Sequence, residues 1–169
     1  YWKNFKFHIH VWDCNRFVNL SNFNNAYKVT LNNIRFQYYT PISLSYFDRI
    51  TELSIMSCVI NENFFLPNIK RMKLYDTNIK NIGVFPNLEQ LIIVQSEVNG
   101  LCLLKNLKHL RLNHFNNICD VSMFKKLENL SIENSYNITE IYNMNNLKHL
   151  ILINTKVINI YNLDNLETL

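Results

Sequence analysis

Two histidines separated by one residue, His8 and His10, are the first side chains in this sequence whose types and spacing could support chemistry. Residues two apart in a strand point to the same side, so both imidazoles could approach one metal ion. A zinc site needs three or four protein ligands, and the sequence places no acidic or cysteine side chain to complete the set. The pair is therefore interpreted as part of an exposed strand, and no metal site is expected.

No motif of an enzyme or of a cofactor site accompanies these histidines. The sequence contains no glycine-rich phosphate loop, no nucleophile elbow and no recognisable order of triad residues. We therefore expect a protein that is not an enzyme and that binds no cofactor.

The four cysteines, Cys14, Cys58, Cys102 and Cys119, form no closely spaced pair, which argues against a zinc knuckle or a redox motif. They are interpreted as small buried hydrophobic residues. This use of cysteine favours an intracellular, reducing location, although a signal peptide upstream of Tyr1 is compatible with the sequence.

Composition narrows the classes of partner. The 169 residues are 48% hydrophobic, which is enough to bury a substantial core in one elongated unit. The formal charge of +4 comes from 17 Lys and Arg against 13 Asp and Glu, interspersed along the chain, so nucleic-acid binding is not expected. Uninterrupted apolar runs are a few residues long, far short of the roughly 20 that cross a bilayer. No membrane span is expected.

The elements that must position any binding residue belong to a repeat of 19 or 20 residues. Apolar residues recur at its first, fourth and sixth positions, in the frame LxxLxL. The units begin at Ile50, Ile69, Leu88, Leu107, Leu127, Leu147 and Leu166. Alternation at the fourth and sixth positions predicts a strand whose third, fifth and seventh residues point outward.

A second apolar set follows each predicted strand, with members every three residues, such as Ile79, Ile82 and Phe85. A spacing of three suits 3₁₀ turns or extended chain better than an α-helix with 3.6 residues per turn. Little α-helix is therefore expected.

This pattern resembles the leucine-rich repeat family, strongly over residues 50–169 and weakly over residues 2–49. The resemblance implies an α/β solenoid, a horseshoe with a parallel β-sheet on the concave face and mostly 3₁₀ or extended convex segments. The repeat is similar to the internalin-type subclass but one LxxL triplet shorter. Residues 1–49 are expected to form irregular capping repeats, and residues 50–169 regular repeats that continue beyond the chain.

The family's ninth position usually carries asparagine, and here the pattern departs from it. The shorter units have Cys58, Thr77, Ser96 and Thr155 at this position, and the two longer units have Asn116 or Asn117 and Tyr136 or Asn137 nearby. Hydroxyl and thiol groups can supply a weaker version of the same hydrogen bond.

The outward strand residues are the candidate binding surface, because the family resemblance implies a role in protein–protein interaction. The residues predicted to contact a protein partner are Arg71, Lys73, Tyr75, Ile92, Val94, His109, Arg111, Glu133, Ile151 and Ile153. Exposed Ile and Val suggest a protein-binding site, but strand propensity also explains them. The cations could meet an acidic segment, or could equally form a solvated face. The alternative function is a structural spacer with no ligand of its own.

Overall fold

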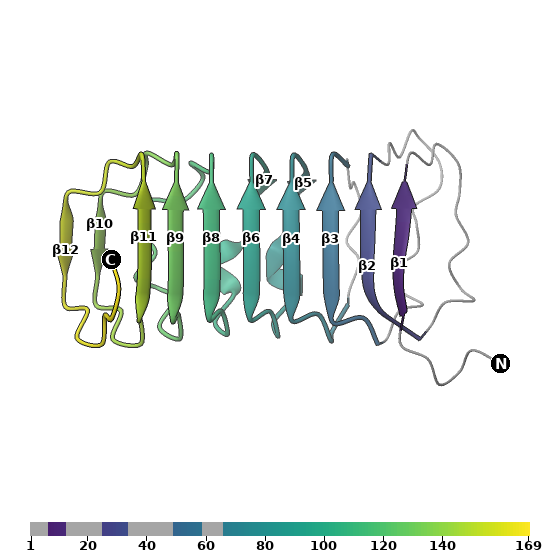
Figure 1. The fold of residues 1–169 in the computed structure, drawn as a ribbon, viewed down its shortest axis with the longest axis horizontal. Helices are drawn as coiled ribbons and strands as arrows, with labels where there is room; N and C mark the ends of the chain where they lie inside the picture. The colour runs from purple at the N-terminus through teal and green to yellow at the C-terminus, as the bar shows by residue number, and fades with distance from the viewer. Residues whose placement is uncertain (1–6, 13–24, 34–48, 59–65) are drawn as a thin grey trace.

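The computed structural model describes residues 7–12, 25–33, 49–58 and 66–169. Eight described strands lie side by side in one parallel sheet, in the order β1-β2-β3-β4-β6-β8-β9-β11 (Figure 1). They are β1 (Phe7–Trp12), β2 (Ala26–Asn32), β3 (Glu52–Met56), β4 (Arg71–Tyr75), β6 (Gln90–Val94), β8 (His109–Asn113), β9 (Asn129–Glu133) and β11 (His149–Ile153). Because these strands are parallel and adjacent in chain order, the chain winds as a solenoid with one strand of this sheet per turn.

Equivalent repeat positions lie opposite each other from strand to strand. Leu91 of β6 pairs with Leu110 of β8, and Leu110 pairs with Leu130 of β9. The first of these steps is 19 residues and the second is 20, yet the register is the same. From β2 to β9 the fourth-position and sixth-position side chains are buried, as the alternation predicted, and they form the central row of the core.

The opposite side of the solenoid contains short strands and 3₁₀ turns. Strand β5 (Asn78–Ile79) pairs with β7 (Glu97–Val98), and β10 (Glu140–Tyr142) pairs with β12 (Asn159–Tyr161). The 3₁₀ turns η3 (Ile82–Val84) and η4 (Leu101–Leu103) lie behind the sheet in Figure 1. No α-helix occurs among the described residues, so the expectation of little helix is confirmed. The proposed capping role of residues 1–49 lies largely outside the described ranges and stays a prediction.

The residue that follows each strand of the sheet from β2 onward has a left-handed backbone with φ of 47° to 51°. These residues are Asn33, Ser57, Asp76, Gln95, His114, Asn134 and Asn154. In the first six, the backbone N–H donates to the carbonyl of the last strand residue in the next turn, as Gln95 does to Asn113 at 3.0 Å. The left-handed residue turns the chain out of the sheet, and its backbone N–H adds one more hydrogen bond between the two turns.

The ninth repeat position carries a hydrogen-bond ladder, as the family resemblance implied. The Ser96 hydroxyl donates to the Val94 carbonyl at 2.8 Å and accepts the Thr77 N–H at 3.1 Å. In the longer units, however, the position belongs to Phe115 and Ser135. The Ser135 hydroxyl accepts the Phe115 N–H at 3.0 Å. The neighbouring asparagines, which sequence reasoning put forward, lie in the exposed turn instead.

A second ladder, of asparagines just before the unit starts, was not foreseen. Asn87, Asn106, Asn146 and Asn165 each donate through Nδ2 to a backbone carbonyl of the preceding turn, at 2.6 to 2.9 Å. This ladder satisfies carbonyl groups at the bends where the chain enters the strands.

The cysteines only partly match the expectation that all are buried. Cys58 is buried, but Cys102 and Cys119 are free and exposed, and Cys14 lies outside the described residues. Both exposed thiols lie in segments that connect strands, where the repeat imposes no apolar side chain. The intracellular location inferred from cysteine use stays a prediction. Within the described ranges, no helix has the length and apolar character needed to cross a bilayer.

Candidate functional site

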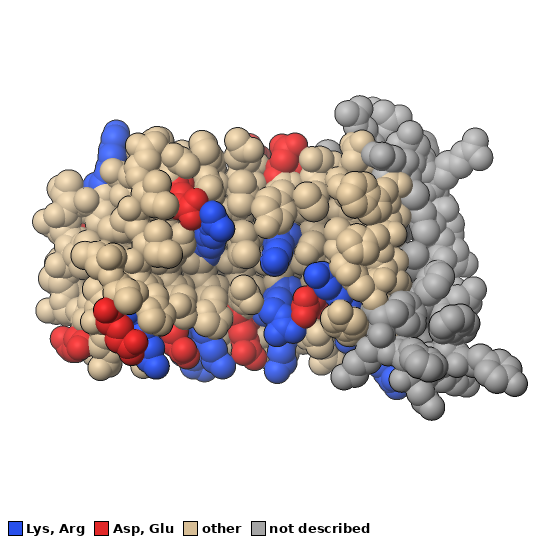
Figure 2. All heavy atoms as spheres, in the orientation of Figure 1, with Lys and Arg blue, Asp and Glu red and all other residues tan. Residues whose placement is uncertain are grey.

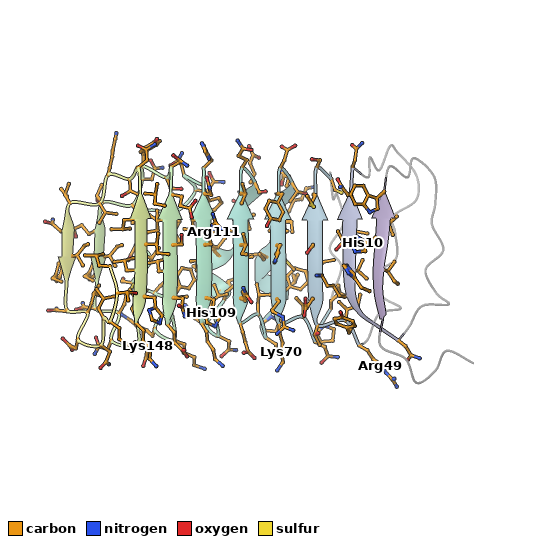
Figure 3. The ribbon with its side chains drawn as sticks, viewed as in Figure 1. His10, Arg49, Lys70, His109, Arg111 and Lys148 are labelled. Atoms are coloured by element: carbon orange, nitrogen blue, oxygen red, sulfur yellow. The ribbon has the colours of Figure 1, made fainter. Side chains whose placement is uncertain are left out.

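The outward side chains of the eight-stranded sheet form one continuous surface, here called the sheet face. Each strand from β3 onward contributes its first, third and fifth residues, as Gln90, Ile92 and Val94 of β6 do. A few charged side chains are scattered over this face, whereas Lys, Arg, Asp and Glu gather more densely along the border where the strands begin (Figure 2). Lys70 and Lys148 lie on that border (Figure 3).

Arginines on the sheet face pair with glutamates on neighbouring strands. Arg71 contacts Glu52, which also lies 3.9 Å from Lys28. Arg111 donates from Nε to Glu133 Oε1 at 2.9 Å. Because both arginine side chains are half exposed, each pair contributes little to stability, typically about 0 to 1 kcal/mol. Their effect is to hold the guanidinium groups in place.

Glu133 is the more fully bonded of the two carboxylates. Besides Arg111, the Ser131 hydroxyl donates to it at 2.9 Å and the Asn113 amide at 3.0 Å. The hydrogen bond from Arg111 is the main reason that the pKa of Glu133 is lowered, with smaller contributions from Ser131 and Asn113. Lys73, by contrast, has no ion-pair partner within the described part of the chain.

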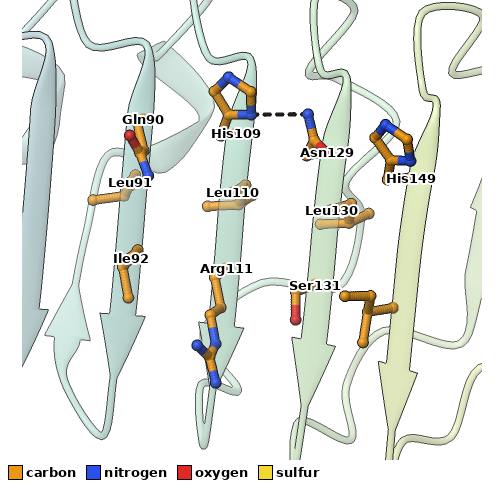
Figure 4. A pocket seen from close by; sticks show the side chains of 11 residues that line it. Gln90, Leu91, Ile92, His109, Leu110, Arg111, Asn129, Leu130, Ser131 and His149 are labelled. Carbon is orange, nitrogen blue, oxygen red and sulfur yellow. Dashed lines mark hydrogen bonds between the residues drawn. The ribbon is translucent and has the colours of Figure 1, made fainter.

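A shallow hollow of about 260 Å³ crosses β6, β8, β9 and β11 (Figure 4). Its floor is formed by the strands at Leu91, Leu110 and Leu130, whose side chains point into the core. Ile92 and Ile151 stand at its two ends. The hollow exists because β9 presents small side chains here, including Ser131, between the larger outward residues of β8 and β11.

Imidazole groups form one side of the hollow. His109 Nδ1 lies 2.9 Å from the Asn129 amide nitrogen, and His149 Nδ1 lies 2.8 Å from the Thr168 hydroxyl (Figure 4 shows the first). An amide nitrogen donates, so in this arrangement His109 Nδ1 accepts and the proton of the neutral ring is on Nε2. The Arg111 side chain extends the other way along β8, toward the strand end.

The structure brings part of the predicted contact set together. Four of its residues line the hollow: Ile92, His109, Arg111 and Ile151. Val94, Glu133 and Ile153 lie at the carboxyl ends of their strands, and Arg71, Lys73 and Tyr75 lie on β4, beside the hollow. All ten occupy outward positions of the sheet.

Sequence reasoning missed four residues that line the hollow, namely Gln90, Asn129, Ser131 and His149. Charged and apolar residues had been singled out, whereas the shape depends on small and polar ones. A usable signal was present: within the repeat frame, the fifth position reads Ile92, Arg111, Ser131, Ile151, so one small residue stands between large ones.

His8 and His10 lie on β1, far from the hollow in the strand order. His10 Nε2 is 2.9 Å from His8 Nδ1, and His8 Nε2 is 2.8 Å from the Thr30 hydroxyl. The pKa of His8 is lowered, first by burial and then by the neighbouring His10 and Lys28. Among the described residues no group of three or more potential metal ligands occurs, and these two imidazoles are engaged with each other.

The parallel sheet, the one-strand turns and the buried LxxLxL ladder together define the fold of a leucine-rich repeat solenoid. Among solved structures, the chain is similar to internalin C2 of Listeria monocytogenes strain 4b F2365. The two share 22% identity with a TM-score of 0.65, over 95% of this chain and 79% of the other. An internalin (inlF) from the same strain has 14% identity and a TM-score of 0.50, over 88% of this chain and 55% of its own length. No protein-family model matches the sequence, and neither does any curated protein.

Proposed function

We propose that this chain is a protein–protein interaction module whose sheet face contacts a protein partner, without catalytic activity of its own. Solenoids of this fold generally mediate protein–protein interaction, which supports the class of function but names no partner. The observation that carries the proposal is the hollow between Ile92 and Ile151, because it combines apolar side chains at its ends with a polar border.

The exposure of apolar side chains on β11 fits a role in contacting a protein partner. Ile151 and Ile153 are each about half exposed, at 51% and 52%, on the same strand of the face. An interface typically has an apolar centre surrounded by polar groups, and the energy of binding concentrates where a large side chain fills a pocket. The sheet face offers both features within four adjacent strands.

A matched pair of double variants tests the proposal. The baits are the parent chain, the sheet-face variant Ile92→Ser with Ile151→Ser, and the control variant Leu103→Ser with Ile158→Ser. Leu103 and Ile158 are also exposed apolar residues, at 55% and 79%, but they lie outside the sheet. Each bait is used for affinity purification from cells that naturally produce the protein, with quantitative mass spectrometry of the captured proteins.

The parent and the control variant are expected to retain the same partner, and the sheet-face variant is expected to lose at least about 90% of it, as removal of about 1.4 kcal/mol or more implies. A partner lost with the control variant instead would place the interface outside the sheet face. Background alone with all three baits would favour the alternative function, a structural spacer. Thermal unfolding of each bait verifies that the variants are folded.

A further inference from the structure

The sheet face has more cations than anions, and its anions are already engaged. Its charged residues in the described strands are Lys28, Arg71, Lys73, Arg111, Glu52 and Glu133. Four cations against two carboxylates leave a net charge of +2. Glu52 contacts two cations and Glu133 accepts from three side chains, so a partner would meet donors more readily than acceptors.

The nearby border does not offset this charge. From the unit at Ile69 onward, the second residue of each unit alternates in sign along the border, in the order Lys70, Glu89, Lys108, Glu128, Lys148, Glu167. Glu89 pairs with Lys70 at 3.4 Å and with Lys108 at 3.2 Å. Three cations and three carboxylates cancel, so the excess positive charge belongs to the sheet face itself.

Four of the five histidines in the chain, His8, His10, His109 and His149, occupy the sheet face. In His109 the Nδ1 atom is bonded within the sheet, which leaves the Nε2 proton for a ligand. The face therefore offers an imidazole N–H donor as well as its cations to the carboxylates of a partner.

The volume of the hollow limits the size of the chemical group that can bind in it. Pockets for whole small molecules are about 300 to 1,000 Å³, whereas this one is about 260 Å³ and open. Its dimensions and the isoleucines at its two ends suit a single apolar side chain whose flanking residues lie across the sheet face.

From these observations we propose that the partner contacts the sheet face through an acidic segment, with one apolar side chain in the hollow and carboxylates on Lys73, Arg111, His109 and His149. This inference rests on the proposed function and adds the chemistry of the partner to it.

The groups around the two imidazoles are compatible with a carboxylate of the partner. Gln90 of β6, Asn129 of β9 and Arg111 of its own strand surround His109. Asn129, Thr168 and Ile151 lie around His149, with Lys148 on the adjacent border. Glu133 lies on the same face but is held by Arg111. A carboxylate placed beside either ring therefore meets hydrogen-bond donors and cations.

A random linear peptide library displayed on phage is the probe that tests the inference. Selection is carried out against the parent chain, with the sheet-face variant Ile92→Ser and Ile151→Ser as counter-selection. Enriched peptides are then synthesised, and their dissociation constants are measured at low and at high salt concentration. The measurement is repeated with His109→Gln plus His149→Gln, and with His114→Gln, which removes an imidazole located beyond the end of β8.

We expect enriched peptides with several Asp or Glu and one aromatic or aliphatic residue, which bind more weakly at high salt concentration. The double histidine variant should bind them about fivefold more weakly, and His114→Gln should bind them as the parent does. Enriched peptides that are neutral or basic, or binding indifferent to salt, would overturn this inference while leaving the proposed function standing. If no peptide prefers the parent to the sheet-face variant, both proposals fail.

Discussion

Single residues with a left-handed backbone determine how each turn leaves the sheet. An L-residue pays about 1 to 2 kcal/mol in this conformation, and asparagine tolerates it better than most. Asn occupies the position after three of the strands, but Gln95 occupies it after β6, with φ of 47° and an exposed side chain. The left-handed backbone at Gln95 therefore lowers the stability of the folded protein.

Replacing Gln95 with glycine should stabilise the protein by up to about 1 kcal/mol. Glycine removes the steric cost of the left-handed backbone, although its greater freedom in the unfolded chain offsets part of the gain. The N–H bond to Asn113 stays in place, since it is made by the backbone. Chemical denaturation monitored by circular dichroism measures the difference.

Gln95→Ala is the matched control. It also removes the side chain but keeps a Cβ, so its stability should stay close to that of the parent. Equal stabilisation by both variants, or destabilisation by glycine, would show that the backbone strain is not the cause.

The element that the repeat conserves is a five-residue strand with two buried side chains. Leu110 of β8 is 3% exposed and lies between Leu91 and Leu130 in the central row of the core. Leu110→Ala should create a cavity and cost about 2 to 5 kcal/mol. Because a solenoid is stabilised by contacts between adjacent turns, β6 and β9 should also loosen.

Hydrogen exchange followed by mass spectrometry checks both parts of this expectation. The exchange of peptides from β6, β8 and β9 should accelerate most, and that of β3 should change least. Arg111→Ala, an outward neighbour on the same strand, is the control and should leave the exchange pattern nearly unchanged. Uniform acceleration along the whole chain would instead indicate a single cooperative unit.

The strands could be predicted from the sequence because the buried apolar residues of successive turns recur at a regular spacing. Leu91, Leu110 and Leu130 fix the register, and once the inward residues are known the outward ones follow from alternation. The second apolar set likewise predicted 3₁₀ and extended segments, and η3 and η4 confirm it.

The hollow was harder to foresee because its shape comes from differences between neighbouring turns. Ser131 is an ordinary residue by type, and only its place between Arg111 and Ile151 makes it part of a depression. The ion pairs were also missed. Glu52 was not considered beside Arg71, since their pairing depends on which side-chain conformations are adopted across the sheet.

At the scale of the whole molecule, burial is uneven along the solenoid. Ile141 in β10 is fully buried, whereas Ile160, its partner in β12, is 39% exposed. Leu152 and Leu163 are likewise partly exposed, although their counterparts in earlier turns are buried. In this chain, the turn that contains β11 and β12 therefore gains less from the hydrophobic effect than the turns around β6 and β8.

Amide exchange in the parent chain should consequently show a gradient. Protection is expected to be greatest in β6 and β8 and to decrease through β9 to β11, because local opening follows the number of buried neighbours. Hydrogen-exchange NMR under native conditions resolves this strand by strand. Equal protection in β8 and β11 would contradict the nearest-neighbour description.

The turns of 20 residues keep the same strand register as those of 19, and the extra residue lies in the exposed bend that includes Asn116 and Asn117, or Tyr136 and Asn137. Residues added at this bend extend outward from the solenoid and leave the sheet undisturbed. Foreign segments, such as an epitope or a spectroscopic label, could therefore be grafted at these bends, one turn of the solenoid apart, to make a molecular ruler along the edge of the protein.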